Sequence, residues 1–552
     1  MRSRVRLKAS RAIAALTGLL LVGSPAAAAV PTAKMSYYQQ KAVWAICDPG
    51  EPPEGMPEDV WKMIWKDLEC ADVVVPMDYR NPGAGNLTIA ISRLKASDPA
   101  RRQGVLLLNP GGPGGNGLLM PSFFRNDAIA KPFDLIGFDP RGVGRSTELS
   151  CEEPSSPPLV ETRPTDDQFG RFAADALAQE RACEQAGGGL RKFISTANTA
   201  RDMDVIRAAI GEKKINYLGF SYGTYLGAAY GSLFPSKLNR SVLDSSMHPD
   251  WFYYEASKQQ AVAARENVDA WAGWLAQRDS RYHFGKTAAE VRATLDAVRA
   301  RLAKKPVPWP DAPPGYPDID GSLFDMILGG ASPSRPMWHE LALLIGAVRD
   351  ASQTTKNALT TSEGKAFRAL YGVIKETYNG VFPAVTCEAD WPKDLKVYEA
   401  RMRIFRKKYP YGPGAMAAAP TNCTFRSFTP PEKLVDLKRA GYPTGLVVQA
   451  EFDPATQYDG GPAMAAKLNN NLISIKDEGS HGIYGGNACA TKKIDDYLIK
   501  GILPGSRTVC PGAPRPDVPV DGARSGRTLT DTGPIDQRVA KIIKAGKLGR
   551  FR

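Results

Sequence analysis

The chain has 552 residues, of which 43% are apolar and 23% charged, and this composition fits a large globular protein rather than a disordered or fibrous one. The formal net charge of +13 is concentrated at the two ends, because five basic residues lie in the first eleven and residues 521–552 hold eight basic side chains against three acidic ones. The body of the chain carries little excess charge, which argues against a nucleic-acid-binding groove.

The first 29 residues have the pattern of an export signal. Basic residues up to Arg11 precede an apolar run from Ala12 to Val22, and small residues suited to cleavage follow at 26–29. The apolar run is about half as long as the roughly 20 residues that a membrane-spanning helix needs. We therefore expect residues 1–29 to be a signal peptide, the mature protein to be secreted and extracellular, and none of it to be inserted in a membrane.

The chain contains eight cysteines, an even number, and disulfide bonds persist in exported proteins. Because the entropy lost on closing a loop grows with its length, we expect each cysteine to pair with its neighbour in the sequence. No Cys-x-x-Cys motif or Cys/His cluster suggests zinc, so we expect no metal site. The expected pairs are Cys47–Cys70, Cys151–Cys183, Cys387–Cys423 and Cys489–Cys510.

The first half of the chain alternates between strand and helix patterns. Residues 72–96 resemble a hairpin of two strands, and the short apolar runs that follow, bounded by Gly or Pro, are typical of strands buried on both faces. This order predicts a mostly parallel sheet flanked by helices. The expected strands are 104–108, 133–138 and 215–220, and the expected helices are 199–210 and 221–232.

The sheet pattern is interrupted late in the chain. Apolar strands at 241–243 and 445–449 lie about 200 residues apart, and helical segments rich in Trp, Tyr and Arg fill the interval. Such an interruption predicts an inserted, largely helical lid domain. The predicted domains are the signal peptide 1–29, the first part of the core 30–249, the lid 250–440, the C-terminal part of the core 441–514 and a basic, flexible tail 515–552.

The segment Gly219-Phe220-Ser221-Tyr222-Gly223 fits the motif G-x-S-x-G and stands between a predicted strand and a predicted helix. In the α/β-hydrolase fold this motif forms a tight turn that exposes the hydroxyl of a nucleophilic serine, and a side chain at either glycine would collide with neighbouring backbone. The context therefore predicts an α/β-hydrolase with Ser221 as its nucleophile.

A serine nucleophile needs a general base and an acid, which follow it in the order acid, then His, in this fold. His481 comes just after the last predicted strand, 472–475, and is the predicted base, whereas we expect His248, His283 and His339 to have surface or packing roles. The predicted acid is Asp453, which ends the strand at 445–450. Asp244 is the alternative acid, because it ends the preceding strand.

Attack on a carbonyl produces an oxyanion that needs two preorganised N–H donors. We expect one donor to be the amide of Tyr222, directly after the nucleophile, and the other to be Gly112 in the glycine-rich loop 109–117. Asp139 lies in a later loop, 139–146, and we expect it to have a structural role in bracing a loop rather than a role in the chemistry. The glycine-rich loop lacks the G-x-x-x-x-G-K-[ST] pattern of a phosphate site and contains no Lys, so we expect no nucleotide cofactor, and no other cofactor is implied.

These motifs together resemble the secreted tripeptidyl aminopeptidases of actinomycetes, which are related to the proline iminopeptidases. The resemblance spans most of the chain and is carried by segments 109–115, 137–144 and 219–223, by Asp453 and by His481. It implies a serine peptidase with Ser221, Asp453 and His481 as its triad, a helical lid, and release of tripeptides from peptide substrates with free amino termini.

An aminopeptidase must recognise a protonated amine, and a carboxylate is the natural partner for a charge that has lost its water. Glu388 and Asp390, beside Cys387 in the predicted lid, are the candidates, and Trp391 is expected to wall the pocket. We expect a monomer that acts on peptides. The alternatives are a secreted esterase or lipase with the same triad and, in another class, a noncatalytic secreted binding protein.

Overall fold

The computed structural model describes residues 37–53, 56–151, 158–310, 312, 318–352, 359–374, 380–523 and 533–545. The predicted signal peptide, 1–29, lies outside these residues. A ten-stranded sheet forms the centre of the core in the order β1-β2-β3-β5-β4-β6-β7-β10-β11-β12. Its strands are β1 (Ala45–Ile46), β2 (Glu69–Pro76), β3 (Asn86–Leu94), β4 (Val105–Asn109), β5 (Asp134–Phe138), β6 (Ile215–Phe220), β7 (Leu238–Asp244), β10 (Leu446–Ala450), β11 (Asn471–Lys476) and β12 (Arg507–Pro511).

The sheet is antiparallel from β1 to β5 and parallel from β5 to β12. The central parallel strands β4, β5, β6 and β10 are buried along their whole length, as their continuous apolar runs predict. The strands expected from the sequence are therefore present, and the mostly parallel α/β-hydrolase sheet is confirmed.

Helices cover both faces of the sheet. Alternate residues of each strand, such as Leu107 and Tyr217, pack with α5 (Thr196–Ala209), α6 (Tyr222–Leu233) and α15 (Gly460–Leu468). The residues between them, such as Leu106 and Leu218, pack with α3 (Met120–Phe123) and α16 (Ala488–Lys500) on the other face. Because successive side chains of a strand point to opposite faces, one sheet supports two separate cores.

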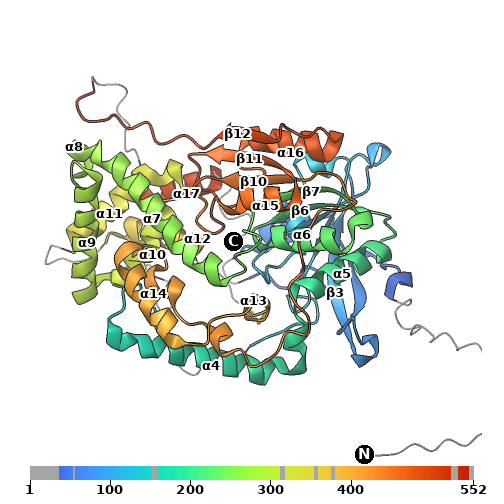
Figure 1. The fold of residues 1–552 in the computed structure, drawn as a ribbon. Coiled ribbons are helices and arrows are strands. Elements are labelled where there is room, and N and C mark those ends of the chain that lie inside the picture. The colour runs from blue at the N-terminus through green and yellow to red at the C-terminus, as the bar shows by residue number, and fades with distance from the viewer. Residues whose placement is uncertain are drawn as a thin grey trace, which may run out of the picture.

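A second body of helices lies beside the sheet, on the left in Figure 1, and has an apolar core of its own that includes Trp271, Phe324 and Trp338. We call these helices the lid. They are α7 (Tyr254–Ala276), α8 (Asp279–Tyr282), α9 (Ala288–Lys304), α10 (Gly321–Ala331), α11 (Trp338–Ala351), α12 (Thr361–Ile374), α13 (Val381–Thr386) and α14 (Leu395–Lys408), with a two-stranded sheet of β8 (Val307–Pro308) and β9 (Asp318–Ile319).

Two further helices join the lid from outside the predicted insertion. Helix α4 (Phe169–Gly187) packs through Phe169 and Phe172 against Met402 and Phe405 of α14, and it runs along the bottom of Figure 1. Helix α17 (Ile535–Ala545) places Val539, fully buried, in the lid core. The remaining helix, α2 (Glu58–Trp65), lies near the amino terminus of the described chain.

The predicted flexible tail, 515–552, differs from the structure where it is described, at 515–523 and 533–545, and its other residues lie outside the described ones. Arg515 pairs with Asp477 at 2.8 Å, the carbonyl of Val518 accepts from Arg278 at 2.9 Å, and Asp521 accepts from the amide of Ser280 at 3.0 Å. Residues 513–523, which we call the strap, thus run from the core across the lid before α17 docks. Apolar positions spaced along α17 explain the docking, because they form one face that the lid buries.

All four disulfides form between the expected neighbours, Cys47–Cys70, Cys151–Cys183, Cys387–Cys423 and Cys489–Cys510. Cys151–Cys183 ties α4 to the loop that follows β5, and Cys489–Cys510 ties α16 to β12. Within the described residues, no helix combines the length and the apolar character that crossing a membrane requires.

Candidate active site

Ser221 sits in the turn between β6 and α6 with a backbone φ of 56° and ψ of −127°. A non-glycine residue reaches this conformation only when its surroundings impose it. The turn is tight, since a Cβ at Gly219 would lie 2.6 Å from the carbonyl oxygen of Gly223, and one at Gly223 would lie 2.6 Å from Oδ1 of Asn109. Both glycines of the motif are thus sterically required, and the serine is held at the amino terminus of α6.

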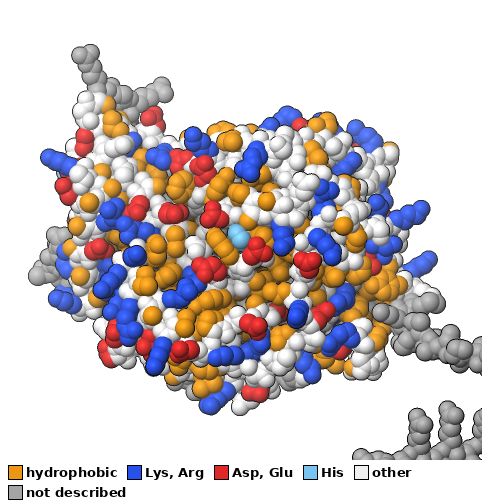
Figure 2. Space-filling model, viewed as in Figure 1, with side chains coloured by type: hydrophobic (Ala, Val, Ile, Leu, Met, Phe, Trp, Pro, Cys, Tyr) orange, Lys and Arg blue, Asp and Glu red, His pale blue; other side chains and the backbone are white. Residues whose placement is uncertain are grey.

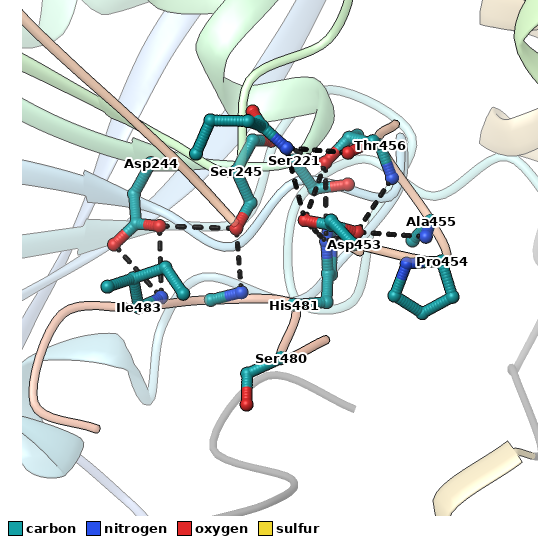
Figure 3. Close-up of polar contacts among 12 residues, drawn as sticks. Ser221, Asp244, Ser245, Asp453, Pro454, Ala455, Thr456, Ser480, His481 and Ile483 are labelled. Carbon is teal, nitrogen blue, oxygen red and sulfur yellow. Dashed lines mark hydrogen bonds and ion pairs between the residues drawn. The ribbon is translucent and has the colours of Figure 1, made fainter. Parts of the chain in front are cut away.

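His481 and Asp453 form a hydrogen-bonded pair near the same edge of the sheet (Figure 3). The imidazole Nδ1 lies 3.0 and 2.9 Å from the two carboxylate oxygens of Asp453, and the carboxylate is fully buried. Asp453 follows β10 and His481 follows β11, which are neighbouring parallel strands. Their adjacent carboxyl ends explain why residues 28 apart in the chain meet.

Backbone amides and one hydroxyl fix the carboxylate of Asp453. Its Oδ1 accepts from the amides of Ala455 and Thr456 at 2.9 Å each, and its Oδ2 accepts from the hydroxyl of Thr456 at 3.0 Å. These hydrogen bonds hold the carboxylate in place and leave it aimed at the imidazole. Thr456 was not anticipated from the sequence, because a threonine three residues after an aspartate is an unremarkable turn residue until the fold shows what its hydroxyl contacts.

Ser221 joins this pair through the end of β7. Its amide donates to the carbonyl of Asp244 at 3.1 Å, and the next residue, Ser245, accepts from the amide of Gly482 at 2.8 Å, directly after the histidine. Figure 3 accordingly shows Ser221 in one cluster with Asp453 and His481. The arrangement brings together the three residue types that acyl transfer by a serine requires.

The alternative acid, Asp244, has a different set of partners. Its carboxylate accepts from the amides of Ile483 and Tyr484 at 3.0 and 2.7 Å, whereas Nδ1 of His481 is bonded to Asp453. The geometry therefore favours Asp453 as the residue that orients the imidazole. Of the other histidines, His248 stacks on Trp251, and His339 lies 2.6 Å from the hydroxyl of Tyr282 inside the lid.

The glycine-rich loop after β4 lies against the turn that holds Ser221. A Cβ added to Gly111 would lie 2.4 Å from the carbonyl of Phe220 and 3.1 Å from the amide of Tyr222. The next residue, Gly112, has a φ of 105°, and Tyr222 is the first residue of α6, so its amide has no partner within the helix. This placement is compatible with the predicted oxyanion donors, the amides of Gly112 and Tyr222.

Asp139 braces the same loop. Its carboxylate accepts from the amides of Gly117 at 2.8 Å, Leu118 at 3.1 Å and Arg145 at 3.0 Å, and burial raises its pKa. The structural role expected for this aspartate is confirmed.

The variant Gly111→Ala tests how closely the loop must approach the nucleophile. Its methyl group would overlap the carbonyl of Phe220, and the positive φ of Gly111 adds strain, so the loop must move away from Ser221. We expect kcat to fall about 100-fold, as when one oxyanion donor is lost, with KM nearly unchanged. Gly170→Ala, where the structure shows open space within 4 Å, is the matched control. Wild-type kcat in Gly111→Ala would show that the loop does not serve the reaction.

The two candidate amine-binding acids lie in different surroundings. Glu388 accepts from the amide of Thr196 at 2.6 Å and from its hydroxyl at 3.1 Å, and that hydroxyl lies 2.9 Å from the hydroxyl of Tyr222. Asp390 is 98% exposed at its side chain and pairs with Arg426 at 3.3 Å. Glu388 is therefore linked to Tyr222, the residue after Ser221, whereas Asp390 faces solvent. Thr196, which links Glu388 with Tyr222, was not anticipated from the sequence.

Aromatic side chains of the lid pack around this end of the site. The ring of Tyr253 lies 6.4 Å from that of Tyr222 and 5.9 Å from that of Phe382. Trp391 packs on Tyr254 at 5.3 Å and donates through Nε1 to the carbonyl of Thr386 at 3.1 Å. On the face seen in Figure 2, apolar side chains gather toward the middle, with charged side chains of both signs among them.

Comparison with known proteins agrees with this geometry. A family model of the alpha/beta hydrolase fold matches residues 104–342, and one described as TAP-like protein matches 409–510. Tripeptidyl aminopeptidase of Streptomyces lividans is 35% identical over 482 residues, which cover 82% of this chain and 85% of that protein.

Two mycobacterial relatives carry different names. Serine protease Hip1 of Mycobacterium tuberculosis is 26% identical over 488 residues, covering 85% of this chain and 91% of that protein. Carboxylesterase B of the same organism is 30% identical over 465 residues, covering 81% of this chain and 86% of that protein. The resemblance inferred from the motifs is confirmed by the match to the streptomycete enzyme over most of both chains. The chain belongs to the tripeptidyl aminopeptidase family, serine peptidases with the α/β-hydrolase fold.

Proposed function

We propose that the protein is an exported exopeptidase that releases tripeptides from the free amino termini of peptides. The observation that carries this proposal is the position of Glu388, a lid carboxylate linked through Thr196 to the side chain of the residue that follows the nucleophile. A carboxylate there can bind the amine of a peptide whose carbonyl lies at Ser221. The names of the streptomycete relatives support a product of three residues.

The chemistry follows from the positions of the catalytic groups. His481 takes the proton of the Ser221 hydroxyl as the oxygen attacks the peptide carbonyl, and Asp453 stabilises the imidazolium that forms. The amides of Tyr222 and Gly112 bind the oxyanion. His481 then gives its proton to the leaving amine, and water, deprotonated by the same imidazole, hydrolyses the acyl-enzyme and releases the short peptide.

The carboxylate of Glu388 is well suited to a cationic ligand. Burial raises its pKa to about 8, which the hydrogen bonds from Thr196 only partly offset. A peptide amine has an ordinary pKa near 8 and is therefore mostly protonated at neutral pH. When it binds, the buried negative charge of Glu388, which is unfavourable alone, becomes part of an ion pair. Because the carboxylate form of Glu388 increases toward pH 8, we expect KM for a free-amine peptide to fall as the pH rises from 6 to 8.

The variant Glu388→Gln tests this assignment. Removing one partner of a desolvated charge pair costs several kcal/mol, so we expect kcat/KM for a tripeptide substrate with a free amine to fall about 100-fold. The pH dependence of KM should disappear, and the low rate on the N-acetylated substrate should stay the same. Asp390→Asn is the matched control and should behave as wild type. A free-amine preference that survives in Glu388→Gln would remove this residue from the amine site.

An esterase is the second candidate, because Carboxylesterase B is among the relatives. Chromogenic substrates of one to four residues, each with a free or an acetylated amine, separate the two activities when compared with simple acyl esters. Release that needs a free amine and is fastest with three residues supports the peptidase. Equal rates on acetylated peptides or esters would overturn the proposed specificity while leaving Ser221 as the nucleophile.

The proposal of export is supported by the four disulfide bonds, since such bonds persist in oxidising compartments. Amino-terminal sequencing of the protein recovered from culture medium would test both secretion and the predicted removal of residues 1–29.

A further inference from the structure

Two residues at the end of β7, Asp244 and Ser245, contact all three segments that carry the proposed catalytic residues. Strand β7 lies between β6, which leads to Ser221, and β10, which leads to Asp453. Asp244 is in register with Phe220 on one side and with Val448 on the other. The end of β7 is therefore the central point of the site, although neither of its two residues takes part in the proposed chemistry.

The polar groups of these two residues reach each segment separately. The carbonyl of Asp244 accepts from the amide of Ser221 at 3.1 Å. Its carboxylate accepts from the amides of Ile483 and Tyr484 at 3.0 and 2.7 Å, on the loop that carries the histidine. The hydroxyl of Ser245 accepts from the amide of Gly482 at 2.8 Å, and its carbonyl accepts from Thr456, which binds the acid.

We propose that Asp244 is a positioning residue, whose carboxylate holds the loop 481–484 so that the imidazole of His481 stays aligned between Ser221 and Asp453. This inference rests on the proposed function, because it concerns the same reaction. The carboxylate is fully buried and serves consecutive amides of one loop, Ile483 and Tyr484, with Ser245 beside it. Because burial opposes the charge, the ionised carboxylate depends on these hydrogen bonds, which join it to the loop that carries His481.

The charge state of Asp244 bears on the loop. Burial raises its pKa to about 6, although the amides of Tyr484 and Ile483, the hydroxyl of Ser245 and the nearby His481 all favour the ionised form. Below that pH the carboxyl group of Asp244 carries a proton on one oxygen. That oxygen then faces the N–H and O–H donors of Ile483, Tyr484 and Ser245, so the loop loses one of the acceptors that hold it. Activity should therefore decline as the pH falls through about 6 for a reason additional to protonation of the general base.

Two variants separate positioning from folding. Asp244→Asn keeps the shape and one acceptor oxygen for Tyr484, but it does not titrate, so we expect kcat to fall about tenfold with a shallower acid limb of the pH profile. Asp244→Ala removes all acceptors, and because small misplacements of a catalytic group cost about 100-fold, we expect that loss in kcat with KM within about threefold. Fluorophosphonate labelling of Ser221 should slow in parallel.

Asp325→Asn is the matched control, because Asp325 is an equally buried aspartate that binds Arg163 and Thr162 in the lid. It should lower the melting temperature without changing kcat or the pH profile. All rates are expressed per folded molecule. If Asp244→Ala does not fold, the test of the positioning role rests on Asp244→Asn alone. Unchanged kcat and an unchanged acid limb in Asp244→Asn would overturn the inference, as would a rise in KM alone.

The labelling rate also separates this inference from the proposed specificity. Wild type that reacts with fluorophosphonate but cleaves no free-amine peptide would refute the proposed function, and slower labelling of the Asp244 variants would still support the positioning role. Full loss of activity in Asp244→Asn with little loss in Asp453→Asn would instead make Asp244 the acid of the triad.

Discussion

Ser221→Ala is expected to lower kcat by about 10⁶-fold, because the remaining groups cannot replace the nucleophile and the members of a triad act as a unit. KM should change little, since the lid and the loop at 109–117 are untouched. The same variant should lose all fluorophosphonate labelling, which wild type should show at this one serine. Hydrolysis of a chromogenic tripeptide substrate and mass spectrometry of the labelled peptide measure both effects.

The control for this experiment is Ser232→Ala on the same helix. Its hydroxyl donates to the carbonyl of Ala228 at 2.7 Å and to that of Lys438 at 3.1 Å, away from the turn at Ser221. We expect wild-type labelling and nearly wild-type kcat. Substantial peptidase activity in Ser221→Ala would rule out the acyl-enzyme mechanism proposed for this site.

Asp453→Asn is expected to reduce kcat about 10⁴-fold with little change in KM. The carboxamide keeps the volume of the side chain, but it cannot stabilise the imidazolium, and it favours a tautomer of His481 that cannot accept the proton of Ser221. Rates measured from pH 5 to 10 should show the deficit throughout the range. The melting temperature should fall only slightly, because the amides of Ala455 and Thr456 still find an acceptor oxygen.

The matched comparison is Asp244→Asn, which changes the other buried aspartate at the carboxyl edge of the sheet. A loss of about tenfold there against about 10⁴-fold at Asp453 would distinguish a residue that holds a loop from one that orients the base. A loss below tenfold in Asp453→Asn would show that the acid is elsewhere.

The central strands and the residues that follow them could be predicted because their signals are local. Strands such as β4 and β6 are short, mainly apolar runs, as expected of strands that are buried on both faces. The chain has only four histidines, and only one of them follows the last apolar strand, so the predicted base required little further information. The disulfide pairs were predictable because each cysteine has one near neighbour.

The parts that were missed depend on contacts between distant segments. Strand β12 has only one buried residue, Cys510, so it lacks the apolar run by which a strand is predicted. The strap has the composition of a solvated tail and makes its contacts with the lid. Helix α17, in contrast, carried a local signal that was overlooked, because Ile535, Val539 and Ile542 recur at helical spacing. The roles of Ser245 and Thr456 depend on three strands ending at the same place, which no short window of sequence contains.

The choice between Glu388 and Asp390 also needed the fold. They are two residues apart beside a disulfide, so the sequence makes them equivalent candidates, but one reaches Thr196 and the other pairs with Arg426 in solvent. A carboxylate that is partly covered differs from one that is hydrated in pKa and in its attraction for a cation.

The lid is assembled from three stretches of chain, because α4 precedes the nucleophile, α7 to α14 follow β7, and the strap with α17 follows β12. About 200 residues separate the end of β7 from β10, so the strands that position Asp453 and His481 leave the ribosome long after the one that positions Ser221. Contacts this distant in sequence form late in folding. On the proposed mechanism, a partly synthesised chain carries the nucleophile without its base, and we expect peptidase activity only once nearly all of the polypeptide has been made.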